Sequence, residues 1–479
     1  MNTASFSFLA LALIAASAYN AGKSIAWRQW TLLAASICFL STFSRSLVGF
    51  LPLIGFLVLG FIGLRAMQWP STRKFYVPFL ILTVGVFVWL KKYTFLPSLS
   101  FLRYAYVTIG LSYMLFRVLH LLIEAHASPS FQKVSFVSYL NYTLNFMTLV
   151  SGPIDRYEHF AEEQLVPCRA PLSIFEAGEG IHRIVVGFFK VVVLSWLLIG
   201  LQKESLDALS AGQVARMRIF TGVAIAVSYP LYLYANFSGY TDIVVGVGRF
   251  FHFRLPENFD RPFAADNLMS FWSRWHMTLS AWLKRYVYDP LLLNMMRQAS
   301  SRAWEPYIGG FALFVTFFLV GVWHGRTSEF LVFGLSQGVG VGGNQMYQIL
   351  LAKRLGRARY RTLTSNYFYS QLSRGLTFAY FTFSLFWFWS TWKQIGAIGH
   401  ALGASGVLSV MLLTFLGSTI VLSTVEAARN WVLSIKRDGK AALQRRYVLT
   451  VVDTALMVVS LWVVVLLNVP TPEIVYKAF

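Results

Sequence analysis

The chain has 479 residues, of which 56% are hydrophobic and only 13% are charged. Soluble domains carry about 25% charged residues, so this composition excludes an ordinary soluble domain and indicates a membrane protein. The formal net charge of +21 comes from Lys and Arg scattered between apolar stretches and at their ends, where they set topology and reach lipid phosphates. The sequence has no nucleic-acid-binding motif, and its two cysteines are too few for a disulfide framework or a zinc site.

Apolar stretches recur from end to end, and a membrane-crossing helix needs about 20 such residues. We predict an all-α polytopic membrane protein with about eleven transmembrane helices plus re-entrant or interfacial helices, in a single integral domain over residues 1–479. The predicted spans are 4–20, 30–44, 48–66, 75–90, 104–123, 179–200, 217–248, 305–323, 328–350, 371–391, 398–424 and 447–468, with two interrupted stretches at 134–152 and 271–292.

The orientation follows from the basic loops of the last third of the chain. Lys and Arg crowd residues 353–361 and 429–446. Two predicted spans separate these loops, so the positive-inside rule places both in the cytoplasm. The C-terminal PTPEIVYKAF then lies outside. The N-terminal apolar stretch lacks a preceding Lys or Arg, so we expect a retained first span rather than a cleaved signal.

The most unusual stretch is FWSRWHMTLSAWLKRYVYDPLL, residues 271–292, which gathers aromatic and charged side chains around His276. Plotted as one helix over 271–290, it places Arg274 and Arg285 on one face and His276 almost opposite them, with Ser280 nearby. A mostly aromatic stripe is formed by Trp272, Trp275, Leu279, Trp282 and Tyr286. So many charges cannot cross the hydrocarbon core alone, so we predict an interfacial or re-entrant helix with His276 facing inward. An anchor helix with a merely hydrogen-bonded histidine would show the same pattern.

A second histidine, His324, ends the uncharged run YIGGFALFVTFFLVGVWH and stands between Gly321 and Gly325. Ionisable groups at membrane depth are functional candidates, and histidine is the usual general base near neutral pH. The flanking glycines would let another helix or a substrate approach closely. A structural histidine remains the alternative. Neither His276 nor His324 has an acidic third ligand or an H-x₃-H partner beside it, so no metal site is predicted.

ENFDRPFAADNLMSFWSRWHMTLSAWLKRYVYDPLL, followed by GVWHG, resembles the membrane-bound O-acyltransferase family in its bacterial cell-envelope branch. GLSYMLFRVLHLLIEAH (110–126) and YPLYLYANFSGYTDIVVGVGRFFHFRLPENF (229–259) support the resemblance. SGPIDRYEHF (151–160) is most similar to the D-alanine export acyltransferase of the teichoic-acid pathway. Alginate- and peptidoglycan-type O-acetyltransferases are the other relatives. The family core would cover about 100–420, and residues 447–479 would form a C-terminal span and extracytoplasmic tail.

The resemblance implies a bundle with a narrowed centre, which an acyl thioester enters from the cytoplasm and a hydroxyl from outside. His324 matches the catalytic histidine of the family, and His276 matches its supporting one. The final IVYKAF is similar to a C-terminal F-x-Y-x-x-F motif with Ile474 where Phe is usual, which makes Tyr476 an acyl-relay candidate. The candidates for orienting the carbonyl or lining the tunnel are Trp323, Trp275, Asn236, Tyr240, Asp242, Arg274 and Ser280.

We therefore predict an O-acyltransferase of the bacterial inner (cytoplasmic) membrane that passes a D-alanyl or acetyl group to a hydroxyl for cell-envelope polymer modification. No bound cofactor is expected. The expected partners are membrane lipid, an acyl carrier protein or coenzyme A thioester on the cytoplasmic side, and an extracytoplasmic acyltransferase- or esterase-like protein. The alternative is a proton-coupled transporter or flippase of an envelope precursor, although the sequence lacks the paired repeats typical of transporters. The acyl group, the donor, the final polymer and the oligomeric state stay open.

Overall fold

The computed structural model describes residues 2–97, 102–128, 131, 133–165, 172–212, 214–435 and 441–466. Over these residues the regular elements are helices, and a single β-bridge joins Phe259 and Trp275. Six helical segments are long and apolar enough to cross a bilayer: Val48–Gln68, Arg73–Lys91, Ile174–Ser210, Arg216–Phe250, Glu305–His324 and Trp392–Trp431. Phe6–Ala21 and Thr450–Val465 are shorter apolar helices. The prediction of an all-α, multi-pass membrane protein is confirmed.

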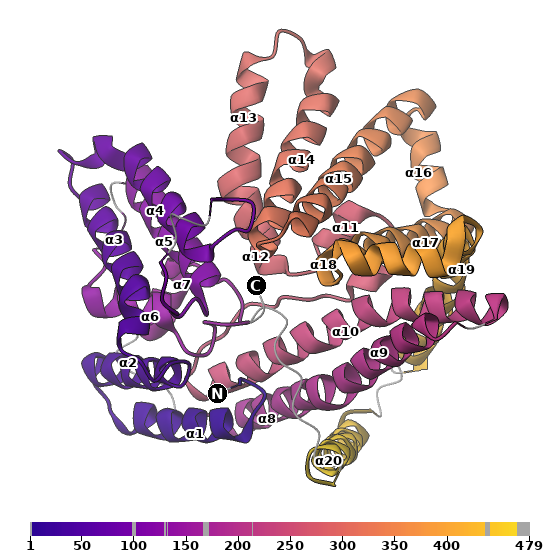
Figure 1. Cartoon of the computed structure of the whole chain (residues 1–479). Coiled ribbons are helices and arrows are strands. Elements are labelled where there is room, and N and C mark those ends of the chain that lie inside the picture. Colours follow the sequence, from indigo (N-terminus) through magenta and orange to yellow (C-terminus); the bar gives the residue numbers. More distant parts are fainter. Residues whose placement is uncertain are drawn as a thin grey trace. The chain divides into compact units, whose positions relative to one another are not determined.

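The chain divides into two compact units, each considered through its described residues only. The first comprises Met1–Val192, Phe237–Glu257 and Ser460–Phe479, and the second comprises Val193–Asn236 and Asn258–Val459. The first unit contains α1 (Phe6–Ala21), α2 (Ile25–Ser41), α3 (Leu51–Gln68), α4 (Tyr76–Lys91), α5 (Leu111–Ala127), α6 (Phe136–Leu144), α7 (Tyr157–Gln164) and α8 (Ile174–Phe189). The second contains α9 (Trp196–Ser210), α11 (Leu268–Trp272), α12 (Met277–Leu283), α13 (Asp289–Gln298), α14 (Glu305–His324), α15 (Ser328–Leu355), α16 (Arg357–Ser365), α17 (Tyr367–Ser384), α18 (Phe386–Trp389) and α19 (Trp392–Ile435) (Figure 1). Helices α10 (Ala215–Phe250) and α20 (Ala441–Leu466) contribute residues to both units.

Helix α5 forms the interior of the first unit and carries a buried arginine. Arg117 is only 2% exposed, and its guanidinium donates hydrogen bonds to the carbonyl oxygens of Tyr142 (3.0 Å), Thr143 (3.0 Å) and Thr148 (2.9 Å). The last carbonyls of a helix lack partners within it, so Arg117 satisfies the end of α6 and the loop beyond. The apolar stretch predicted at 134–152 is helical only over Phe136–Leu144.

Helices α8 and α10 pack closely through glycines in the first unit. A methyl group built on Gly187 would lie 2.6 Å from the carbonyl oxygen of Gly239, and one on Gly246 would lie 2.6 Å from that of Gly180. Small residues at such contacts let helix backbones approach within the membrane. The two helices are therefore held by direct backbone contact.

The second unit is organised around the antiparallel helices α14 and α15, which lie side by side (Figure 1). Their contact also depends on glycines: a methyl group on Gly321 would lie 2.2 Å from Gly334 Cα, and one on Gly342 would lie 2.5 Å from the carbonyl oxygen of Gly310. The glycine contacts fix how far α14 advances along α15. His324, the last residue of α14, is therefore held in a defined place.

The glycine contact between α8 and α10 gives a stability prediction with a control in the same helix. Gly187→Ala should lower the free energy of unfolding by about 1–3 kcal/mol because the new methyl group overlaps a carbonyl oxygen. Gly178, an exposed glycine of α8 with nothing within 4 Å of a built methyl group, should tolerate alanine and gain up to about 1 kcal/mol from helix propensity. Thermal unfolding of both variants in detergent measures the difference. Equal behaviour of the two variants would contradict the close contact.

Candidate active site

His276 does not lie within one helix, as the sequence had suggested. Helix α11 ends at Trp272 and α12 begins at Met277, with a π-helical turn at Lys284–Tyr288 before α13. His276 stands at the N-cap of α12 with φ 45° and ψ 53°, in the left-handed region. The predicted continuous helix over 271–290 is therefore wrong, and the stripe of Trp272, Trp275, Leu279, Trp282 and Tyr286 is interrupted after its first member.

The helix breaks because its backbone pairs with the segment that precedes it in the chain. The Asp260 N–H donates to the Arg274 carbonyl oxygen (2.9 Å), and the Met277 N–H donates to the Asn258 carbonyl oxygen (2.9 Å). The Asn258 side-chain Oδ1 also accepts hydrogen bonds from the backbone N–H (3.3 Å) and hydroxyl (2.7 Å) of Thr278. A left-handed non-glycine residue costs about 1–3 kcal/mol and persists only where its surroundings impose it. These bonds impose it on His276.

Trp272 and Trp275, which precede His276 in the chain, fasten this break to the rest of the second unit. The Trp272 Nε1–H donates to Gln337 Oε1 of α15 (3.2 Å), and the Gln337 amide donates to Ser384 Oγ of α17 (2.6 Å). Trp275 stacks on Phe271 at a ring-centroid distance of 5.6 Å and lies 5.1 Å from Phe381. The turn that carries His276 is therefore tied to two long helices.

His324 lies in an aromatic enclosure and is only 5% exposed. Its ring centroid lies 4.5 Å from that of Trp323, 5.0 Å from Phe388 and 6.1 Å from Phe333. The ring of His276, itself 1% exposed, lies 6.5 Å from Trp323. The rings of both predicted histidines thus lie near the indole of Trp323, although the two histidines belong to different elements.

Phe388 is held against His324 by the chain that follows it. Its short helix α18 leads into Trp392, whose backbone N–H donates to Glu329 Oε1 (3.1 Å) and whose Nε1–H donates to Ser328 Oγ (2.8 Å). Ser328 and Glu329 open α15. The two hydrogen bonds close the loop after α17 onto the start of α15, which keeps the aromatic enclosure of His324 shut.

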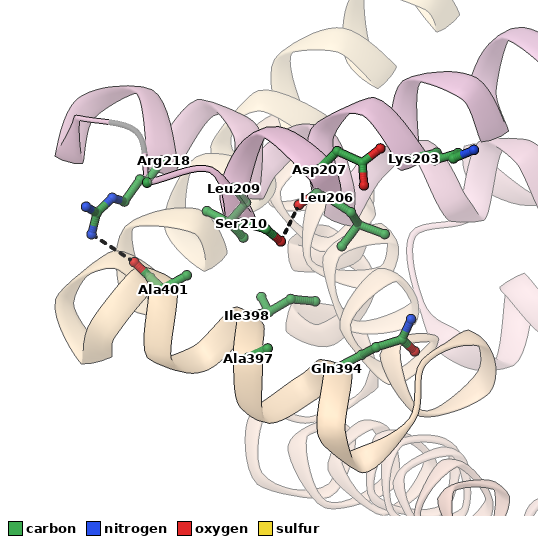
Figure 2. A pocket seen from close by; sticks show the side chains of 11 residues that line it. Lys203, Leu206, Asp207, Leu209, Ser210, Arg218, Gln394, Ala397, Ile398 and Ala401 are labelled. Atoms are coloured by element: carbon green, nitrogen blue, oxygen red, sulfur yellow. Dashed lines mark hydrogen bonds between the residues drawn. The ribbon is translucent and has the colours of Figure 1, made fainter.

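Among the cavities in the described part of the second unit, one borders the turn that carries His276. A groove of about 720 Å³ between α9 and α19 has a rim that includes Lys203, Asp207 and Arg218, and Arg218 donates to the Ala401 carbonyl oxygen (Figure 2). A cavity of about 550 Å³ is lined by α11, α12, the π-helical turn, α14 and α15, and includes Trp272 and Met277. The groove has no histidine among its described lining residues. The second cavity is the better candidate for a reactant because it borders the His276 turn.

The remaining predicted site residues fall into both units. In the second unit, Asn236 is fully buried, Arg274 is half-buried, and the Ser280 hydroxyl lines the 550 Å³ cavity and donates to the Trp275 carbonyl oxygen (3.4 Å). In the first unit, the Tyr240 hydroxyl donates to Asn2 Oδ1 (2.7 Å). Tyr476 lies outside the described residues.

Asp242, predicted as a tunnel residue, makes two ion pairs in the first unit. Its carboxylate oxygens lie 2.6 Å from Arg183 Nη2 and 2.6 Å from Lys190 Nζ, and Arg183 also pairs with Glu257. A carboxylate removed from water needs such partners. The pairs lie along the glycine contact between α8 and α10, so the contacts of Asp242 are those of a residue that holds two helices together.

The sequence pattern did not single out Asn258, Gln337 or Phe388. Asn258 was present in the ENFDRPF segment, but only its hydrogen bonds to the His276 turn distinguish it from a loop asparagine. Gln337 is a polar residue in an otherwise apolar stretch, which was an available signal. Phe388 is one of many aromatic residues, and no local pattern identifies it.

Burial of the imidazole lowers the pKa of His276 to about 3, because the charged form would be deprived of water. The unfolded chain takes up this proton near the ordinary pKa of 6.5. Between these values the unfolded state binds more protons, so the free energy of unfolding falls as the pH drops below about 6.5. The His276→Asn variant does not titrate there and suits the left-handed backbone. The thermal midpoint in detergent should therefore fall more for the wild type than for this variant between about pH 7 and 4.5. If the thermal midpoints of the wild type and the variant fell equally over this pH range, the lowered pKa of His276 would be contradicted.

Comparison with known proteins identifies the family to which the chain is similar. The model of the MBOAT, membrane-bound O-acyltransferase family matches residues 36–372, which include His276 and His324. A teichoic acid D-alanyltransferase of Bacillus subtilis is 29% identical over 58% of this chain and 68% of its own length. A peptidoglycan O-acetyltransferase of Helicobacter pylori is 29% identical over 44% of this chain and 38% of its own length. A probable alginate O-acetylase of Pseudomonas fluorescens is 27% identical over 50% and 45%.

The chain thus spans about two thirds of the first of these relatives and less than half of the other two. The family match covers more than half of the chain and contains both buried histidines. The chain belongs to the membrane-bound O-acyltransferase family.

Proposed function

We propose that this protein is an O-acyltransferase that takes an acyl group from a cytoplasmic thioester and passes it to a hydroxyl for the modification of a cell-envelope polymer. The observation that carries the proposal is the convergence of two buried histidines, from separate elements, on Trp323. Membership of the family supports it, as do relatives whose names denote D-alanyl and O-acetyl transfer. The transporter alternative has no such support.

The proposed chemistry gives each histidine a separate task. The hydroxyl oxygen attacks the thioester carbonyl carbon while the His324 imidazole takes its proton. The tetrahedral intermediate collapses, the carbon–sulfur bond breaks, and the thiolate leaves and recovers the proton from the imidazolium. Burial lowers the pKa of His276 and favours its neutral form, so this residue would assist by hydrogen bonding rather than by charge. The apolar cavity of about 550 Å³ beside His276 suits the acyl thioester, which must be kept from water.

The acyl group is proposed to be D-alanyl or acetyl, and the donor an acyl carrier protein or acetyl coenzyme A. Both donors carry negative charge, which suits the basic loops at 353–361 and 429–446. In the proposed topology the chain crosses the bacterial inner membrane about eleven times. Those loops face the cytoplasm, and the C-terminus lies outside. An extracytoplasmic acyltransferase- or esterase-like partner would then receive the acyl group.

His324→Ala should reduce acyl transfer by about 10²–10⁴-fold, because the attacking hydroxyl would lose its general base. The measurement is acyl incorporation into envelope polymer by cells that carry the neighbouring genes, at matched protein levels in the membrane. His400→Ala is the control, since His400 is an exposed histidine of α19 and should retain transfer. Normal incorporation in the His324→Ala strain would remove this residue from the mechanism.

Tyr476 is proposed to carry the acyl group outside the membrane as an ester on its phenol oxygen. Mass spectrometry of the C-terminal peptide should find a D-alanyl or acetyl adduct on Tyr476 in the wild type and none in His324→Ala, because the relay receives its acyl group from the histidine site. The mass of the adduct identifies the acyl group. A wild type that transfers acyl groups with an unmodified Tyr476, even when downstream turnover is blocked, would contradict the relay.

The proposed outward C-terminus is tested by fusing alkaline phosphatase after residue 479. A fusion that stays inactive would contradict the outward C-terminus.

A further inference from the structure

Asn258 is bonded directly to the turn that presents His276. Its backbone carbonyl accepts from the Met277 N–H (2.9 Å), and its side-chain Oδ1 accepts from the Thr278 N–H (3.3 Å) and hydroxyl (2.7 Å). The residue is fully buried, at 0% exposure. Its side chain is therefore held in place by the turn.

The orientation of the Asn258 amide follows from its partners. A backbone N–H can only donate, so the atom facing Thr278 must be the oxygen. The amide nitrogen, which carries two N–H donors, must be the other atom. A flip of the side chain would bring an N–H of the amide against the Thr278 backbone N–H and break that hydrogen bond.

The Asn258 nitrogen Nδ2 has no hydrogen-bond partner among the described residues, and it is buried from solvent. Buried donors are nearly always satisfied, so an unsatisfied one in a rigid side chain needs an explanation. The oxygen side of the same amide makes two bonds, which rules out a generally ill-fitting residue. A donor that is fixed, dry and unpaired is suited to an acceptor that arrives with the substrate.

We propose that Asn258 is a further catalytic residue whose Nδ2–H donates a hydrogen bond to the acyl carbonyl oxygen of the bound thioester. This inference rests on the proposed function. When the acceptor hydroxyl attacks the carbonyl carbon, the carbonyl electron pair moves to oxygen, and the Asn258 amide stabilises that oxyanion. The carbonyl re-forms as the carbon–sulfur bond breaks and the thiolate leaves. The Asn258 side chain would thereby serve both to shape the His276 turn and to stabilise the transition state.

Asn258→Asp separates these two tasks. The aspartate keeps an oxygen for both Thr278 donors and replaces only the Nδ2 donor. It should lower kcat by about 10²–10³-fold, as the loss of one oxyanion donor does, with KM little changed. Thr278→Val removes one bond on the opposite side of the amide and keeps Nδ2. It should lower the thermal midpoint and reduce kcat by less than about 10-fold, since it touches only the support of the amide.

The assay measures thiol release by the purified full-length protein, with excess glycerol as the acceptor hydroxyl, from acetyl coenzyme A and from a D-alanyl-loaded carrier protein, using the donor that the wild type consumes. Should Asn258→Asp fail to fold because of its charge, Asn258→Ala takes its place. A fall in kcat much larger than that of Thr278→Val, at preserved KM, would again support the donor role.

Three results would overturn the inference. Asn258→Asp or Asn258→Ala could turn over like the wild type. Alternatively, the losses of kcat in the Asn258 and Thr278 variants could simply follow their thermal midpoints, which is the behaviour of a structural residue. If the wild type releases no thiol from either donor while remaining folded, the proposed function fails first and this inference fails with it.

Discussion

The left-handed turn at His276 is the constraint on which the rest of the site depends. It ends α11, begins α12 and turns the imidazole inward toward Trp323. Such a backbone is unfavourable for a histidine, so it requires the two main-chain bonds to residues 258–260 and the Asn258 side chain. Because the turn is defined by hydrogen bonds as well as by packing contacts, the backbone that carries His276 is held in one position.

Several charged and polar side chains inside the two units bind fixed protein partners, as the absence of water in a bilayer requires. Arg117 binds carbonyls at the end of α6, Asp242 binds two cations, and Gln337 joins two side chains. Each of these sets also joins separate elements, so the polar groups help to determine how the helices pack. Asn258 differs from them, because only half of its amide is used by the protein.

Hydropathy predicted the long helices well because crossing a bilayer is a local property of 20 or so residues. The span predicted at 305–323 is α14, Glu305–His324, and the one at 217–248 is α10, Ala215–Phe250. The span predicted at 104–123 is instead α5, which buries Arg117, His120 and Glu124 within its unit. The prediction for 271–290 was wrong for a different reason. A helical plot assumes an unbroken helix, whereas the break at His276 depends on hydrogen bonds to residues 258–260, which lie outside the plotted stretch. The hydrogen bond from the Trp392 N–H to Glu329 joins residues 63 positions apart, and no local sequence pattern indicated it either.

The glycines of the GVWHG motif that flank His324 both make close packing contacts with other parts of the chain. Gly321 meets Gly334 of α15 so closely that no side chain fits between them, and a methyl group on Gly325 would lie 2.0 Å from the ring of Phe330. Phe330 in turn packs on Phe388 at 5.3 Å, and Phe388 packs on His324. The first glycine sets the distance between helices, and the second admits the ring that supports the enclosure. The sequence had allowed either a helix or a substrate beside these glycines, and the described contacts are with the protein. Glycines on both sides of His324 thus position its ring through packing, although they have no side-chain chemistry of their own.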